Sequence, residues 1–259
     1  MNPRRAMPQL SVNVNKVATL RNSRGGQVPS VVEAVQVCID AGSPGITVHP
    51  RADARHITAD DVRAIAAALR AQPVKVEFNI EGDPRPDLLD LVEEVRPDQC
   101  TLVPVIPGEV TSQAGWQPGP ATERLRYTID RLHAHGVRVS LFVDPVPEPI
   151  QWASSVGADR IELYTEPYAR AFERGPDLGM RAFTRYADAA RYAHGLGLGI
   201  NAGHDLDLAN LVVFRELPFL DEVSIGHAII SRAVFVGLRT VVREYLDVLA
   251  TGVARRGLI

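Results

Sequence analysis

Eight short strand-like segments alternate with helical segments along the chain, and this alternation limits the fold more than any other feature. Strands are predicted at 10–14, 45–48, 74–78, 99–103, 138–143, 160–164, 199–202 and 222–225. Helices are predicted at 30–41, 59–71, 85–95, 121–135, 147–156, 180–195, 208–214 and 228–250, the last with a break near Gly237. Such alternation is typical of a parallel sheet, and eight repeats predict a (β/α)8 TIM barrel with extra short helices. A doubly wound open sheet is the alternative, but its glycine-rich dinucleotide turn does not follow the first strand.

Length and composition agree with one barrel and exclude some partners. No linker or composition shift divides the 259 residues, so we expect a single domain over 1–259, with 1–9 as a flexible tail. The net charge of −3 argues against nucleic acid as the main partner. We expect a cytoplasmic protein without membrane contact, because no apolar run is long enough to span a bilayer and Met1–Gln9 lacks a signal segment. Cys38 and Cys100 lie in apolar runs and are expected to be buried thiols.

The loop after the second predicted strand carries the densest group of functional side chains. His49, Arg51, Arg55 and His56 follow the buried strand within eight residues, and Thr58-x-x-Asp61 then signals a helix start. In a barrel this loop opens at the carboxyl ends of the strands, where active sites lie. Two imidazoles and two guanidiniums on one loop therefore predict an anion-binding site with acid–base capacity.

Other polar residues are predicted to meet at the same barrel mouth. His204 and His227 follow the seventh and eighth strands, whereas the remaining histidines, 133, 135 and 194, lie near helix ends. Glu77, flanked by Val76 and Phe78, is expected to face inward as a catalytic group, because a partly desolvated glutamate and a histidine can share acid and base duties. Glu162 either does the same or pairs with an arginine such as Arg160 to hold the barrel together.

A phosphate site is predicted near strands seven and eight. Backbone amides after these strands and the start of a short helix commonly bind phosphate in barrels, and Gly226 with the helix start at Ala228 fits this pattern. We expect no metal, because the histidines share loops with arginines and the first strand reads Val-Asn-Val-Asn rather than His-x-His. Three connections, 15–26, 104–120 and 165–179, are predicted as loops, and the second is long enough to cover a site.

The ordered set of motifs resembles the pyridoxine 5′-phosphate synthase family from Leu10 to about Leu249. The matching pieces are Ser-Val-Asn-Val-Asn-Lys-Val-Ala-Thr-Leu-Arg-Asn-Ser-Arg-Gly (11–25), Gly-Ile-Thr-Val-His-Pro-Arg (45–51), Arg-His-Ile (55–57), Asn-Ala-Gly-His (201–204) and Ile-Gly-His-Ala-Ile-Ile (225–230). The resemblance implies an octameric (β/α)8 barrel that condenses 1-deoxy-D-xylulose 5-phosphate with 3-amino-2-oxopropyl phosphate, without a metal or redox cofactor. The products are pyridoxine 5′-phosphate, phosphate and water.

The resemblance also implies roles for individual residues. His49 and His204 match the family's acid–base histidines, and Glu77 matches its catalytic glutamate. The positions that match substrate contacts are Asn13, Arg24, Arg51, His56, Thr101, Glu162, Gly226 and His227.

Four positions depart from the usual family pattern, one of them Gln113 in the loop after the fourth strand, where a glutamate is frequent. Many members have Asp-His where this chain has Asn15-Lys16, and a glycine where it has Asp205. We expect Asn15, Lys16 and Asp205 to lie at the substrate site. Two other hypotheses stay open: a different phosphosugar lyase or isomerase on the same barrel, and a binding protein for a phosphorylated vitamin that has lost turnover.

Overall fold

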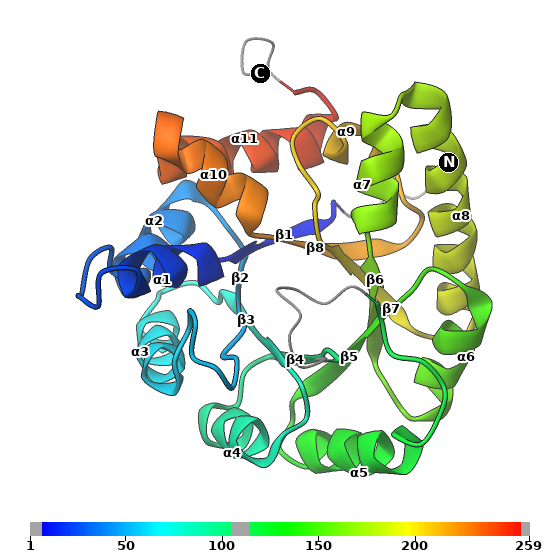
Figure 1. The fold of residues 1–259 in the computed structure, drawn as a ribbon, viewed down its shortest axis with the longest axis horizontal. Coiled ribbons are helices and arrows are strands. Elements are labelled where there is room, and N and C mark those ends of the chain that lie inside the picture. Colours follow the sequence, from blue (N-terminus) through cyan, green and yellow to red (C-terminus); the bar gives the residue numbers. More distant parts are fainter. Residues whose placement is uncertain (1–6, 105–113, 255–259) are drawn as a thin grey trace.

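The computed structural model of the protein describes residues 7–104 and 114–254. Within these residues, eight parallel strands pair in chain order and the first pairs with the last, which closes the barrel (Figure 1). The strands are β1 (Gln9–Asn13), β2 (Gly45–Val48), β3 (Glu77–Gly82), β4 (Gln99–Leu102), β5 (Arg138–Val143), β6 (Arg160–Tyr164), β7 (Gly199–Gly203) and β8 (Leu220–Ile225). The predicted TIM barrel is therefore confirmed.

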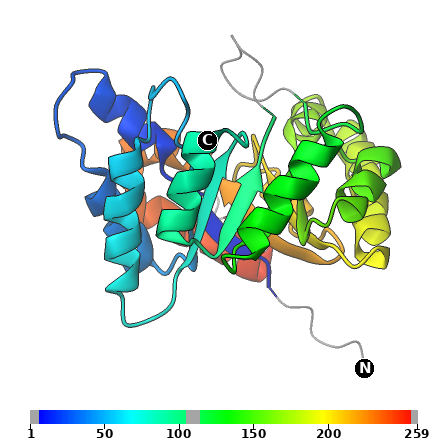
Figure 2. The ribbon, with the colours of Figure 1, turned by 90° about the horizontal axis from the view of Figure 1, so that it is seen from below.

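Helices surround the barrel on its outer side, as the side view also shows (Figure 2). They are α1 (Asn15–Asn22), α2 (Val31–Ala41), α3 (Ala59–Arg70), α4 (Pro86–Val95), α5 (Thr122–His133), α6 (Pro147–Ser155), α7 (Glu166–Glu173), α8 (Pro176–Gly195), α9 (Leu211–Phe214), α10 (His227–Val236) and α11 (Leu238–Thr251). None of the described helices is both long and apolar enough to cross a membrane.

Helix boundaries follow the capping chemistry of the sequence. The Ser30 side chain accepts a hydrogen bond from the Glu33 N–H at the start of α2, and Gly42 ends that helix with φ 104°. Thr58 and Asp61 form the complete capping box that their spacing predicted at the start of α3. The predicted break at Gly237, where φ is 84°, separates α10 from α11.

Three predictions of local structure are wrong. The segment 15–26 was expected to be a loop, but its first eight residues form α1, because Val17 and Ala18 provide a buried face. The expected loop 165–179 contains α7 and the first turn of α8. Residues 1–9 are not all tail, since Gln9 pairs with Glu222 as the first residue of β1; residues 1–6 lie outside the described part.

The largest error concerns β3, which begins three residues later and ends four residues later than the predicted 74–78. Val74 is 72% exposed, so it has no place in a barrel strand. Glu77 opposes Gly45, the first residue of β2, and the strand then continues through Asn79 and Glu81 to Gly82. Polar residues at alternate positions of this strand hid its second half, so the predicted strand ended at Phe78.

Two different cores explain these patterns. Between strands and helices lies an apolar shell, to which Leu10, Ile46, Ile80, Leu141 and Ile161 contribute side chains that are fully buried. Inside the barrel the buried side chains are instead largely polar, including Ser11, Thr47, Asn79, Gln99, Thr101, Ser140, Glu162, Asn201 and Glu222. Along each strand, apolar residues that face the helices alternate with polar residues that face the barrel interior. This alternation is why most of the strands could be recognised from the sequence.

Candidate active site

His49 follows β2 and is held at the carboxyl end of the barrel by its backbone. Its N–H donates to Oδ1 of Asn15 over 2.9 Å, and Nη2 of Arg85 donates to the carbonyl of Pro50 over 2.5 Å. The imidazole is 9% exposed, and its Nε2 has no hydrogen-bond partner among the described residues. Leaving a buried polar atom without a hydrogen-bond partner costs roughly 1–3 kcal/mol of stability. A bound molecule could supply the missing partner and exchange a proton with this nitrogen.

The rest of this loop forms a cationic wall next to His49. The ring of His56 lies 6.0 Å from that of His49, and Nδ1 of His56 is likewise buried without a partner among the described residues. Asp53 bridges the two arginines, at 3.5 Å from Arg51 and 2.6 Å from Arg55. The loop thus keeps a surplus of positive charge beside two imidazoles.

Burial and positive charge make both imidazoles neutral at physiological pH. Burial, followed by the nearby charges of His56, Arg51 and Arg85, lowers the pKa of His49 to about 3. Burial, followed by Arg51, lowers the pKa of His56 to about 4. A neutral imidazole can accept a proton at one nitrogen and donate one at the other, which suits acid–base work.

His204 lies on the opposite side of the mouth, directly after β7. Its ring packs against Phe142, at 4.9 Å between centroids, and against Tyr164, at 5.5 Å. Burial in this aromatic setting lowers the pKa of His204 as well. His204 and Asp205 adopt φ values of 81° and 56°, an uncommon backbone region for residues other than glycine.

Hydrogen bonds from Thr165 help to keep this left-handed turn in place. Its hydroxyl donates to the carbonyl oxygens of Gly203 and His204. The carboxylate of Asp205 turns toward Arg170 of α7, 4.0 Å away. Asp205 therefore shapes the turn that carries His204, with a φ that glycine adopts without strain.

Two buried glutamates lie between the histidines. Glu81, near the end of β3, accepts hydrogen bonds of 3.4 Å from Nδ2 of Asn13 and from Oγ of Ser224. Glu162 of β6 is 3% exposed, and its Oε2 has no partner among the described residues. Burial raises the pKa of Glu81 to about 7, and burial followed by the charges of Glu81 and Glu222 raises that of Glu162 well above its usual range. The mouth can therefore hold a carboxylic acid at neutral pH.

The end of β8 closes the ring of site residues. Gly226 lies so close to Asn13 that a Cβ would come within 2.9 Å of the Asn13 carbonyl, so glycine lets the two strand ends meet. His227 begins α10, is exposed, and lies 3.4 Å from the hydroxyl of Ser231. The helix start was predicted one residue later, at Ala228.

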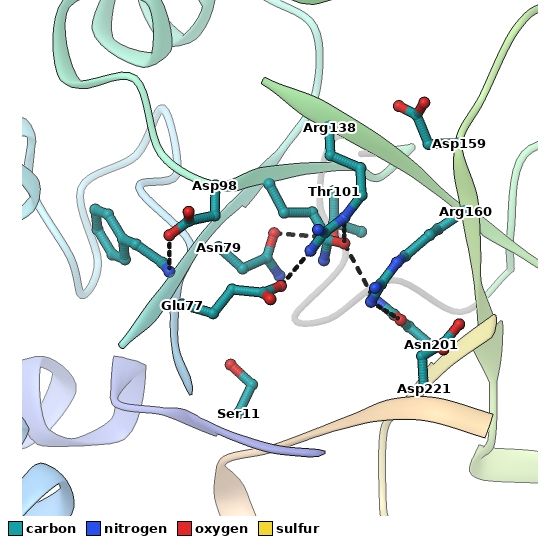
Figure 3. A network of polar contacts seen from close by, with 12 residues as sticks. Ser11, Glu77, Asn79, Asp98, Thr101, Arg138, Asp159, Arg160, Asn201 and Asp221 are labelled. Carbon is teal, nitrogen blue, oxygen red and sulfur yellow. Dashed lines mark hydrogen bonds and ion pairs between the residues drawn. The ribbon is translucent and has the colours of Figure 1, made fainter. Parts of the chain in front are cut away.

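The amino end of the barrel has a separate polar network, which Figure 3 shows. Arg138 forms an ion pair with Glu77 and donates to Oε1 of Gln99 over 3.0 Å, while Arg160 donates to Oδ1 of Asn201 over 2.9 Å. Residues at this end of a TIM barrel usually stabilise the fold and do not take part in catalysis.

The structure brings most of the predicted site residues together, but not all. His49, His56, His204 and Glu162 meet at the mouth, with Asn13, Asn15, Arg51 and Gly226 beside them. Lys16 is exposed on α1, near enough for its charge to lower the pKa of His56.

Two predicted residues lie elsewhere, Glu77 and Arg24. Glu77 is at the amino end of the barrel, paired with Arg138. Thr101 is inside the barrel beside Glu81, its partner on β3, and its hydroxyl donates to Oδ1 of Asn79 over 3.1 Å. Arg24 is exposed in the turn after α1, and that turn lies at the periphery, away from the barrel axis (Figure 1).

The sequence analysis missed Glu81 and Arg85. Both follow the third predicted strand closely, and extending the alternation of Glu77 and Asn79 by two residues would have placed Glu81 inside the barrel. No local signal pointed to Arg85, because its contact with Pro50 joins two different loops.

Part of the long connection after β4 lies outside the described residues, namely 105–113. Its described end packs on the barrel: the Trp116 N–H donates to the Phe142 carbonyl over 2.8 Å, and the indole donates to the Leu102 carbonyl over 3.0 Å. Within the described part of the chain, no group of three His, Cys, Asp or Glu side chains could hold a metal ion.

Solved structures of distant proteins share the fold. The tryptophan synthase α-subunit from Pyrococcus furiosus superposes with a TM-score of 0.62 at 10% identity, covering 94% of this chain and 97% of its own. Thiamine phosphate pyrophosphorylase from the same organism has a TM-score of 0.60 at 12% identity, over 95% and 97% of the two chains. At such identities the likeness concerns the barrel alone.

Sequence relatives are much closer. Proteins named pyridoxine 5′-phosphate synthase are 51% identical over 245 residues in Porphyromonas gingivalis and 48% identical over 256 residues in Leptospira biflexa. These alignments cover 94% and 95% of this chain, and 100% and 98% of the relatives. The family profile described as "Pyridoxal phosphate biosynthesis protein PdxJ" matches residues 10–251. The chain belongs to this PdxJ family.

Proposed function

We propose that this protein is a pyridoxine 5′-phosphate synthase. It condenses 1-deoxy-D-xylulose 5-phosphate with 3-amino-2-oxopropyl phosphate and releases pyridoxine 5′-phosphate, inorganic phosphate and water. The observation that carries the proposal is the group of proton-transfer residues at the carboxyl end of the barrel: two neutral imidazoles, His49 and His204, with two buried carboxyl groups, Glu81 and Glu162, near them. Membership of the PdxJ family supports the same reaction.

The chemistry of the reaction suits such a group. Condensation of a carbonyl with an amine, loss of water and aromatisation are serial proton transfers, and each needs a donor and an acceptor near neutral pH. His49 and His204 are neutral and can accept protons, while a buried carboxylic acid can donate them. Burial also keeps bulk water from an imine that would otherwise hydrolyse.

Two phosphorylated substrates need two anion sites. We assign one to Arg51 and His56 on the loop after β2, together with Lys16, because these residues concentrate positive charge next to His49. We assign the second to Gly226 and His227 at the start of the ten-residue helix α10, where no side chain of the described residues caps the first N–H groups of the helix. Each substrate is then held by its phosphate while its reactive carbon lies between the histidines.

The proposal extends to assembly and location. The family resemblance supports a homo-octamer in the cytoplasm. Sedimentation velocity of the purified protein tests the assembly, and a species of the monomer mass at micromolar concentration would contradict it.

The test of function is direct. The purified protein, treated with a chelator, is mixed with both substrates, and pyridoxine 5′-phosphate is followed by its fluorescence. Product that requires both substrates supports the synthase. Binding of either phosphate without product would instead favour another phosphosugar reaction or a binding role.

A further inference from the structure

The backbone that carries His49 is held from two sides, by loops that are far apart in the sequence. On one side, Oδ1 of Asn15 accepts a hydrogen bond from the His49 N–H over 2.9 Å. On the other side, Nη2 of Arg85 donates to the carbonyl of Pro50 over 2.5 Å. The bound N–H and the bound carbonyl belong to consecutive residues, so the two contacts together fix the dipeptide His49-Pro50.

The local sequence limits the backbone of Arg85 before any tertiary contact forms. Arg85 lies between Pro84 and Pro86, and a residue that precedes a proline is confined to extended backbone. Its φ of −85° and ψ of 152° agree with this restriction. Pro86 then begins α4, for which Arg85 is the N-cap residue. The arginine therefore leaves a stiff connection between β3 and α4.

All three nitrogens of the Arg85 guanidinium form hydrogen bonds. Nη1 donates to Oδ1 of Asp83 over 2.7 Å, and Nε donates to Oδ2 of Asp87 over 2.9 Å. The side chain is only 16% exposed. Because two carboxylates on its own connection already fix the planar guanidinium, Nη2 can bind the Pro50 carbonyl with little further loss of conformational freedom.

The same connection also touches the imidazole. A Cβ on Gly82, the last residue of β3, would lie 3.7 Å from Cδ2 of His49, so the ring packs against this strand end. Its Nε2 has no hydrogen-bond partner among the described residues. The position of this nitrogen therefore depends on how firmly the His49-Pro50 backbone is held.

We propose that Arg85 is a positioning residue for the acid–base histidine: by holding the Pro50 carbonyl, it keeps the imidazole of His49 in place at the barrel mouth. This inference rests on the proposed synthase activity, in which His49 exchanges protons with the substrate. Arg85 acts through the backbone of the neighbouring loop and does not contact the reacting atoms.

The charge of Arg85 is a smaller matter than its hydrogen bond. The charged and titratable groups that face His49 are His56 and Arg51 on its own loop, Arg85 on the connection after β3, and His204 after β7. Burial, then His56 and Arg51, contribute more than Arg85 to the low pKa of His49, about 3. Without Arg85 the imidazole is still neutral near pH 7, so a loss of activity at this pH reports a displaced ring.

The test removes the guanidinium and measures steady-state kinetics. We expect Arg85→Ala to lower kcat by about 10- to 100-fold with KM within a few-fold of the wild type, because a displacement of about 1 Å can cost about 10²-fold. The shape of the pH profile near neutral pH stays the same. Arg85→Lys recovers part of kcat, since an ammonium group can donate to the Pro50 carbonyl but cannot hold both aspartates as well.

Arg63→Ala is the matched control. Arg63 borders the same cavity of about 380 Å³ as Arg85, Pro50 and Arg51, but it lies on α3 and its ion pair with Glu94 is on the surface, with the arginine side chain 46% exposed. Its removal leaves kcat unchanged.

Free guanidinium provides a second measurement. Truncation of Arg85 enlarges the cavity, so a guanidinium ion can enter it and donate to the same carbonyl. Guanidinium chloride at millimolar concentration restores part of the kcat of Arg85→Ala, relative to sodium chloride of equal ionic strength. The wild type and Arg63→Ala do not respond.

Hydrogen exchange followed by mass spectrometry tests the contact without activity. The amides of the loop 51–57 exchange faster in Arg85→Ala than in Arg63→Ala, and guanidinium slows them again. Circular dichroism and binding of inorganic phosphate confirm that each variant is folded.

Four results would overturn the proposal. They are a normal kcat in folded Arg85→Ala, a raised KM with unchanged kcat, a low kcat that neither lysine nor guanidinium restores, and equal loop exchange in the two alanine variants. Absence of product with the wild-type enzyme would contradict the proposed function, while the exchange measurement still decides whether Arg85 holds the loop.

Discussion

Asn15 shows how one residue outside the group of proton-transfer residues can position a catalytic side chain. Its Oδ1 accepts the His49 N–H over 2.9 Å, and its own N–H donates to Oδ1 of Asn13 over 3.0 Å. Asparagine thus links the end of β1 to the loop after β2. An aspartate, the residue expected here from the family resemblance, would supply the same acceptor oxygen.

We expect Asn15→Ala to lower kcat/KM about tenfold or more, because a small displacement of a catalytic group has effects of this size. Asn15→Asp retains the acceptor and should stay within a few-fold of the wild type. Steady-state kinetics of the two variants provide the measurement. Equal losses in both would show that the amide group contacts substrate rather than the His49 backbone.

Gly203 provides a second prediction at the residue scale. A methyl group at this position would overlap Oε1 of Glu162 and come within 3.3 Å of the Ser224 carbonyl. Gly203→Ala should therefore displace Glu162 and destabilise the fold by roughly 1–3 kcal/mol, the usual cost of overpacking. Gly195→Ala is the control, because its Cβ would meet nothing within 4 Å. Urea unfolding decides, and an equal stability of both variants would contradict the close contact.

Single residues could be predicted where a strong local pattern preceded them. His49 and His204 each follow a buried strand, and Glu162 lies within one, so their meeting at the mouth followed from the barrel alone. The partners of these residues could not be predicted, because Asn15 reaches His49 across 34 residues and Arg85 reaches Pro50 across 35. Such contacts depend on loop geometry that no periodicity encodes.

At the scale of elements, β3 and α1 show why polar segments mislead. A strand whose inner face carries Glu77, Asn79 and Glu81 lacks the continuous apolar run expected of a parallel sheet. The helix α1 buries only Val17 and Ala18, so its sequence looks like a cationic loop. The polar side chains of β3 line the barrel interior and those of α1 are half-buried or exposed, so each element is stabilised by its neighbours instead of by its own composition.

The helix α3 follows the loop that carries His49 and His56, and its residue Asp61 makes two stabilising contacts. Its carboxylate completes the capping box with Thr58 and binds Arg21 of α1 through two hydrogen bonds, of 2.5 and 2.8 Å. We expect Thr58→Ala to lower the free energy of unfolding by about 1 kcal/mol, the usual value of an N-cap. Asp61→Ala should cost more, because it also leaves Arg21 half-buried without its partner.

Chemical denaturation of the two variants measures this difference. Arg63→Ala, on the same helix, is the control: its side chain is 46% exposed and its pair with Glu94 lies on the surface, where such pairs contribute about 0–1 kcal/mol. A loss in Asp61→Ala no larger than in Thr58→Ala would mean that the contact with α1 adds nothing to stability.

At the scale of the whole molecule, the apolar shell of the barrel stabilises the fold, and its polar interior holds the ionisable groups. The shell between strands and helices supplies the stability, and at the amino end the carboxylates of Asp98, Asp159 and Asp221 accept hydrogen bonds from the backbone N–H groups of Phe78, Val139 and Ile200. The stability from these contacts offsets the free energy that is needed to bury ionisable groups in the interior. The cost is visible in the raised pKa values of Glu81, Glu162 and Glu222.

That cost predicts an unusual dependence of stability on pH. Glu81 and Glu222 have pKa values of about 7 and about 8 in the folded protein, against a usual 4.5, so the folded state binds more protons than the unfolded state in this range. Their contribution is fully present below about pH 4.5 and is lost as pH rises through 7 and 8. His49 and His56, with pKa values of about 3 and about 4 against a usual 6.5, act in the opposite sense and favour the folded state above pH 6.5.

The two effects oppose each other between about pH 4.5 and 6.5, and only the carboxyl groups continue to titrate above this range. We therefore expect the free energy of unfolding to fall by on the order of 2 kcal/mol between pH 6.5 and 8.5, where many proteins show little change. Urea unfolding at constant ionic strength measures it. In Glu81→Gln the fall should be shallower, because the amide binds no proton in either state. Stability that rises over the same range would show that the buried carboxyl groups ionise in the folded protein as readily as in water.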